Sequence, residues 1–272
     1  MEERTFDTPN GLTLELRIPA GQIRVRAAET GVATVRVDGE RADDTIDMTS
    51  TTLPDGGTRV VVESRGKRAF GFLGLGRDLD VSADVPVGTK LAVDSGSADL
   101  RASGTLGAIA FRTGSGDCAF DEVTGDLTLK AASGDLKGRS VGGDLTSHGA
   151  SGDVDVAAVG GDVVVRTASG DLRLGVVGGS VQVTSVSGDI EIGSLGAGVV
   201  NARSVSGDVA LGVAAGTGVF LDVSSTSGDV RSDLDATGGA DDGAADLQLT
   251  AASVSGDIRI RRASSRAGTE HR

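Results

Sequence analysis

The sequence predicts an all-β protein, a single-stranded parallel β-solenoid (β-helix) made of two-strand coils of about 18 residues each. Three observations support this prediction. A Ser-Gly-Asp turn recurs at nearly constant intervals, apolar residues alternate between the turns, and aromatic residues are only 2% of the chain, with no Trp or Tyr. A thin coil leaves little room for large rings, so stacked Val, Leu, Ile and Ala would replace one broad core.

The turn motif sets the length of the coil. Successive Ser-Gly-Asp motifs lie 18, 18, 18, 18, 19, 21 and 28 residues apart, and a weaker Gly-rich turn falls nine residues after each of the first four. Each coil is therefore expected to hold two nine-residue halves, each with one strand and one corner. The motifs begin at Ser115, Ser133, Ser151, Ser169, Ser187, Ser206, Ser227 and Ser255.

The segments between the turns have the period of strands. In residues 162–166 and 171–174 apolar side chains lie two positions apart, which is typical of a strand with one buried face. No segment has a helical period. Stacking should align equivalent residues into inner ladders, of which one is Leu136, Val154, Leu172, Ile190 and Val209.

The chain divides into three parts on this interpretation: a strand-rich N-terminal cap at 1–93 that merges into the solenoid, solenoid repeats at 94–258, and a flexible basic tail at 259–272. An insertion at 237–246 would help to cover the far end. The strands expected in the cap, separated by turns at 19–21, 29–31 and 54–57, are 12–18, 22–27, 33–37, 59–63, 79–85 and 90–93.

The turn residues have separate structural roles. Glycine permits a positive φ at a tight corner, and the aspartate that follows can accept hydrogen bonds from backbone N–H groups of the turn. The aspartates would form a column of like charges, offset by those bonds or by bound cations. The residues assigned to this role are Gly116, Asp117, Gly134, Asp135, Gly152, Asp153, Gly170, Asp171, Gly188, Asp189, Gly207 and Asp208.

Calcium binding is one alternative function, because β-rolls with 18-residue coils hold calcium in Gly/Asp turns. The turns of this chain are shorter than those of a β-roll and supply fewer oxygens than the 6–8 that calcium needs. A carbohydrate-active β-helix enzyme is the second alternative. The chain has two histidines, His148 and His271, and one cysteine, Cys118, so the sequence predicts no catalytic residues, metal ligands or cofactor.

Charge and the N-terminus narrow the partners and the location. The net charge is −13, with the acidic excess in 94–258, which argues against nucleic-acid binding. The first residues lack the features of a secretory signal, no apolar stretch is long enough to span a membrane, and a single cysteine forms no internal disulfide. These features predict a cytoplasmic protein, with a peripheral position at the inner membrane face as a further option.

One basic and apolar segment is the candidate for a partner contact. Residues 65–77 join arginines and a lysine to two of the six phenylalanines on a glycine-rich stretch, which suits an anionic membrane surface or a protein groove. A hairpin tip folded over the cap is the structural alternative. The candidate contact residues are Arg65, Lys67, Arg68, Phe70, Phe72, Leu73 and Leu75.

The tandem Ser-Gly-Asp coils, together with residues 14–21 and 85–89 of the cap, resemble the putative-adhesin, toast-rack family of bacterial domains of unknown function. The resemblance covers nearly the whole chain. It implies a right-handed β-solenoid with no catalytic residues, and some members are linked to envelope-stress systems beside membranes. We therefore expect a non-enzymatic, adhesin-like interaction scaffold with an unidentified protein partner.

Overall fold

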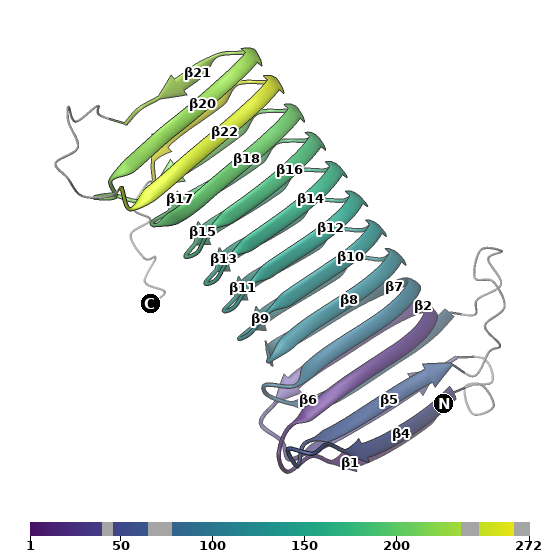
Figure 1. The fold of residues 1–272 in the computed structure, drawn as a ribbon. Coiled ribbons are helices and arrows are strands. Elements are labelled where there is room, and N and C mark those ends of the chain that lie inside the picture. Colours follow the sequence, from purple (N-terminus) through teal and green to yellow (C-terminus); the bar gives the residue numbers. More distant parts are fainter. Residues whose placement is uncertain (40–45, 65–77, 235–244, 264–272) are drawn as a thin grey trace, which may run out of the picture.

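The computed structural model describes residues 1–39, 46–64, 78–234 and 245–263, which form 23 β-strands joined in one continuous sheet. Figure 1 shows the strands stacked side by side along a rod. The predicted all-β parallel solenoid is confirmed. Among the described residues no helix has the length and hydrophobicity needed to cross a membrane.

Each coil of the solenoid contributes one strand to each of two opposite faces. Two long strands, β2 (Leu12–Ala28) and β7 (Lys90–Leu106), take part in both faces. Face A contains their first parts. Two strands lie on the outer side of β2 on this face, β4 (Ile46–Thr52) at the edge and then β5 (Thr58–Ser64). The strands that follow β7 on its other side are, in spatial order, β8 (Ala108–Ser115), β10 (Leu127–Ser133), β12 (Leu145–Ser151), β14 (Val163–Ser169), β16 (Val181–Ser187), β18 (Gly198–Ser206), β22 (Leu247–Ser255) and β20 (Val219–Ser227).

Face B contains the second parts of β2 and β7. Three strands lie on the outer side of β2 on this face, in the order β1 (Glu2–Asp7) at the edge, β3 (Val32–Asp38) and β6 (Asp78–Pro86). The strands that follow β7 on its other side are, in spatial order, β9 (Cys118–Val123), β11 (Leu136–Val141), β13 (Val154–Val159), β15 (Leu172–Val177), β17 (Ile190–Leu195), β19 (Val209–Val213), β23 (Ile258–Arg262) and β21 (Val230–Ser232).

The core is a set of aliphatic ladders between the two faces. In β10, Leu127 and Leu129 point inward and are buried, whereas Lys130 is exposed. The predicted inner ladder from Leu136 to Val209 is confirmed, because each of its members is registered with the next and all are buried. The alternation of apolar residues therefore places one face of every strand in a continuous core.

The first coils are not stacked in the order of the sequence. β2 lies between β7 on one side and the later strands β5 and β6 on the other. Strands β4 on face A and β1 and β3 on face B are antiparallel and close this end of the rod. The parallel ladder thus extends through β2, well before residue 94.

At the C-terminal end of the rod the coils are also stacked out of sequence order. The last coil of the chain, β22 and β23, pairs with β18 and β19 on one side and with β20 and β21 on the other. In Figure 1 the yellow strand β22 accordingly lies between β18 and β20. The outermost coil, β20 and β21, therefore precedes in the sequence the coil that lies between it and the rest of the rod. The longer spacing between the last two Ser-Gly-Asp motifs supplies the residues for this return.

Three local expectations differ from the structure. The expected turn at 19–21 is a corner inside β2, where Gly21 has a φ of 122° while both flanks keep their pairing. Strands β1 and β4 were not expected, because their outer residues are polar and they pair antiparallel at the edge. The tail expected at 259–272 begins within β23, where Arg259 and Arg261 form ion pairs with Asp257 and Glu191.

Candidate functional site

The Ser-Gly-Asp residues form one column at the corner that leads from face A to face B. Five of the predicted corner glycines have positive φ, between 127° and 153°. At each of them a Cβ atom would collide with the carbonyl oxygen of the equivalent glycine one coil earlier. Glycine is therefore required by both conformation and packing. These residues are Gly134, Gly152, Gly170, Gly188 and Gly207.

The aspartates of this column link one coil to the next. The carboxylate of Asp135 accepts a hydrogen bond from the backbone N–H of Asp153 at 2.9 Å, and that of Asp153 accepts one from Asp171 at 2.8 Å. The predicted bonds lay within a single turn, whereas the observed bonds join equivalent residues of adjacent coils. In-register stacking places each N–H beside the carboxylate of the previous coil. These charge-assisted bonds offset the repulsion within the column.

This use of the carboxylates bears on calcium binding. One oxygen of each column aspartate already accepts a backbone hydrogen bond. Within the described part of the chain no group of three His, Cys, Asp or Glu side chains is placed to hold a metal ion. We therefore expect an excess of a calcium chelator to leave the thermal unfolding midpoint unchanged, measured by circular dichroism. A fall in the midpoint that added calcium reverses would contradict this prediction.

Face A carries a row of basic residues that sequence reasoning missed. Strands β8, β10, β12, β14, β16, β18 and β22 are neighbours and contain no Asp or Glu. Outward-facing residues at one register position form what we call the basic column, with Thr184 between its last two members. Its members are Arg112, Lys130, His148, Arg166 and Arg203. The sequence signal was the 18-residue spacing of the first four.

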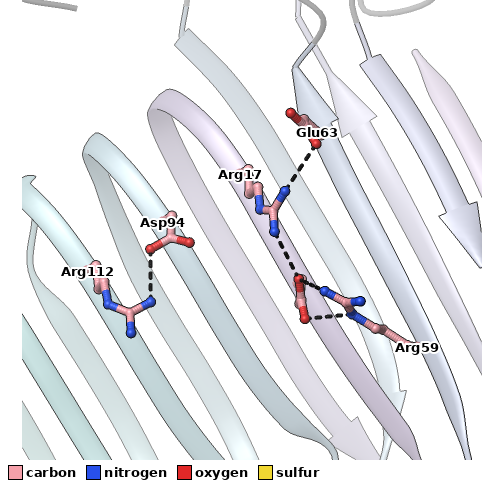
Figure 2. Close-up of polar contacts among 6 residues, drawn as sticks. Arg17, Arg59, Glu63, Asp94 and Arg112 are labelled. Atoms are coloured by element: carbon pink, nitrogen blue, oxygen red, sulfur yellow. Dashed lines mark hydrogen bonds and ion pairs between the residues drawn. The ribbon is translucent and has the colours of Figure 1, made fainter. Parts of the chain in front are cut away.

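At the N-terminal end the same register is balanced by acidic residues (Figure 2). Asp94 forms an ion pair with Arg112 at 3.4 Å, and Arg17 contacts Glu63 at 3.3 Å. Arg17 also contacts Glu15, which accepts two hydrogen bonds from Arg59 at 2.7 and 2.8 Å. The hydrogen bonds from Arg59 lower the pKa of Glu15 and raise that of Arg59 itself. At this end of face A each of these surface arginines is therefore paired with a carboxylate.

Beyond Arg112 the basic column has no such balance. Lys130, Arg166 and Arg203 form no ion pair or hydrogen bond with any described residue. The corner aspartates nearest to Lys130, Asp126 and Asp135, are four and five positions away along the chain. At about 3.3 Å per residue these aspartates lie up to about 13–17 Å from it, at the corners, whereas the Debye length in physiological salt is about 8 Å. The column therefore stays positive on an acidic protein.

Cys118 and His148 both lie where their side chains are poorly placed for catalysis. Cys118 is fully buried, and its burial, with a smaller contribution from Asp117, raises the pKa of its thiol to about 12. It is therefore a core residue and a poor nucleophile. His148 stands in the basic column between Lys130 and Arg166.

The predicted contact segment, residues 65–77 with Arg65, Lys67, Arg68, Phe70, Phe72, Leu73 and Leu75, lies outside the described residues. Its contact with a membrane or a protein remains a prediction.

The chain is similar to two solved structures and matches one family model. A solved protein from Clostridium sporogenes, titled "putative cell adhesion protein", is 12% identical, with 96% of this chain and 99% of that chain covered and a TM-score of 0.30. A "putative adhesin" from Bacteroides fragilis is 11% identical, with 95% and 96% covered and a TM-score of 0.45. No curated protein sequence is significantly similar. Residues 13–261 match the family described as Toastrack DUF4097, and the chain therefore belongs to this family.

Proposed function

We propose that this protein is a non-enzymatic, adhesin-like binding scaffold whose face A holds a linear anionic polymer along the axis of the rod. The observation that carries the proposal is the basic column, in which Lys130, Arg166 and Arg203 are unpaired among the described residues, within a run of seven neighbouring strands that contain no acidic residue. Arg112 and Lys130 are register partners in neighbouring strands, where like charges destabilise a sheet. Because no described residue pairs with Lys130, Arg166 or Arg203, a negatively charged partner is the best explanation for the column.

The spacing of the column favours a polymer over a compact ligand. Its basic residues stand in single file on coils about 4.8 Å apart, with Thr184 in the coil between Arg166 and Arg203. The next outward register position beside it holds Thr128, Thr146, Gln182 and Asn201, with Val164 between Thr146 and Gln182, and its polar members can donate or accept hydrogen bonds. The paired strands fix both columns, so binding orders little of the backbone.

A catalytic function has less support. The buried thiol of Cys118 is held in its neutral form, and the register neighbours of His148 are two cations that cannot orient it as a general base. The mechanism proposed is therefore recognition by a preformed surface.

Removing three of the unpaired cations should weaken binding to a polyanion. We expect the variant Lys130→Gln/Arg166→Gln/Arg203→Gln to elute from immobilised dextran sulfate at clearly lower salt than the wild type. If each residue makes one ionic contact, the slope of log affinity against log salt should fall by about 2–3. Neutral dextran should retain neither protein.

A matched control separates this surface from net charge. The variant Arg173→Gln/Arg231→Gln/Arg259→Gln removes three exposed arginines of face B, each paired with an aspartate, and so changes the net charge equally. It should elute close to the wild type. If both variants eluted at equally lowered salt, the weaker binding would be explained by the change in net charge alone, and a role for face A would be refuted.

A further inference from the structure

A second basic surface lies on face B, near the N-terminal end of the rod. It is an open depression of about 640 Å³ over five adjacent strands, β6, β2, β7, β9 and β11. This volume is within the range of about 300–1,000 Å³ that is usual for ligand sites. We call it the basic depression, because it is lined by Arg24, Arg26, Arg101, Lys137 and Arg139.

Three of these cations are not used by the fold. Arg101, Lys137 and Arg139 are exposed and make no ion pair or hydrogen bond with any residue that the structure describes. Arg26, in contrast, pairs with Asp84 at 2.7 Å. The second lining carboxylate, Asp121, accepts a hydrogen bond from the Gly104 N–H at 3.0 Å. The depression therefore keeps an excess of unpaired positive charge.

The sheet is locally irregular at this place. The pairing of β7 with β9 is interrupted between Ala102 and Thr105, where Gly104 has a φ of 80°. Such bulges often occur beside binding sites because they redirect side chains. In the next coil Gly138 has no side chain and lies against the ring of Phe120, whereas the following coil has Val156 in this register position. Phe120 and Val156 are buried, so the missing side chain of Gly138 makes room for the Phe120 ring in the core. On the outer surface, the side chain between Arg101 and Lys137 is that of Ala119, which is small and apolar.

The arrangement of the cations indicates several anionic groups on one ligand. Arg24 and Arg101 occupy adjacent strands in one register, and Lys137 lies two coils beyond Arg101, with Ala119 between them. At about 4.8 Å per coil, Arg101 and Lys137 are about 10 Å apart. Arginine pairs with carboxylate or sulfate through two parallel hydrogen bonds.

The surroundings of the depression distinguish between classes of ligand. The strands that form it are paired on both sides, so no backbone edge is available to bind an extended peptide. A flat bilayer would not reach into a concave surface. A short sugar chain can place its rings over Ala119 and its acidic groups beside the cations.

We propose that the basic depression binds an acidic oligosaccharide of a few rings, with its carboxylates or sulfates held by Arg101, Lys137 and Arg139. This site is on the opposite face from the basic column and does not depend on the function proposed for face A.

Binding can be measured by calorimetry with the wild-type chain and two probes, an oligogalacturonate trimer and a sulfated trisaccharide. We expect at least one probe to bind, and Lys137→Gln/Arg139→Gln to weaken its affinity about tenfold or more. Ala119→Leu should also weaken binding, because it fills the depression without a change in charge. The probe that binds more tightly distinguishes carboxylate from sulfate recognition.

The control removes two arginines from the far part of face B. Arg173→Gln/Arg259→Gln changes the net charge equally and should retain wild-type affinity. The face A triple variant should also bind the trisaccharides normally. The proposal is overturned if neither probe binds, if the control weakens binding as much as Lys137→Gln/Arg139→Gln, if Ala119→Leu has no effect, or if hexaglutamate binds as tightly as the sugars.

Discussion

The variant Gly170→Ala should lose about 3–5 kcal/mol of stability and unfold about 10 °C below the wild type. Gly170 has a φ of 129°, which alanine adopts only with strain, and its new Cβ would collide with the carbonyl oxygen of Gly152. The position of the Cβ is fixed by the backbone of residue 170, and the oxygen belongs to the backbone of Gly152, so neither can rotate away and the two coils must separate. Separation weakens the bond from the Asp171 N–H to the Asp153 carboxylate.

The neighbouring strand offers a matched control, Gly149→Ala. The nearest atom to a Cβ at Gly149 is the carbonyl oxygen of Ala131 at 3.4 Å, an ordinary contact. Because alanine restricts the unfolded chain, we expect a change within about 1 kcal/mol in either direction. Urea unfolding followed by circular dichroism compares the two variants. Similar stabilities would show that the corner column does not require glycine.

The centre of the solenoid is predictable from sequence because its signals repeat. Every coil from Ser115 to Ser206 combines a glycine corner with apolar alternation, so one coil determines the register of the next. The order of the coils at the two ends is not predictable in this way. A longer spacing such as that from Ser227 to Ser255 shows that extra residues are present but does not indicate where the strand that follows them pairs.

The two proposed binding surfaces also differ in whether they can be predicted from the sequence. The basic column follows the repeat period and could be found by aligning the coils, because Arg112, Lys130, His148 and Arg166 are 18 residues apart. The basic depression brings together Arg24, Arg101 and Lys137, whose spacing has no period. It arises from the out-of-order stacking of β2 beside β7 and from the bulge at Gly104. Only the folded chain reveals it.

Loss of the last coil, β22 and β23, should also unfold the coil that precedes it in the sequence, β20 and β21. Leu249→Asp places a charge at a fully buried position of β22, and a chain that ends at residue 244 lacks β22 and β23 altogether. The truncation removes four fully buried leucines and isoleucines, worth about 6–12 kcal/mol of burial. Within the described residues β20 and β21 pair with other coils only through β22 and β23, so they should detach as well.

Hydrogen exchange can distinguish this order of coils from simple sequential stacking. In both variants we expect amide protection to fall in residues 219–232, while β10 to β16 stay protected because each coil depends mainly on its neighbours. Gln248→Asp is the matched control, since Gln248 is exposed beside Leu249 on the same strand and should keep full protection. Sequential stacking would instead place β20 directly on β18. Protected β20 and β21 in the truncated chain would therefore refute the insertion of the last coil, and their exposure would show that the chain completes the end of its core only with its final strands.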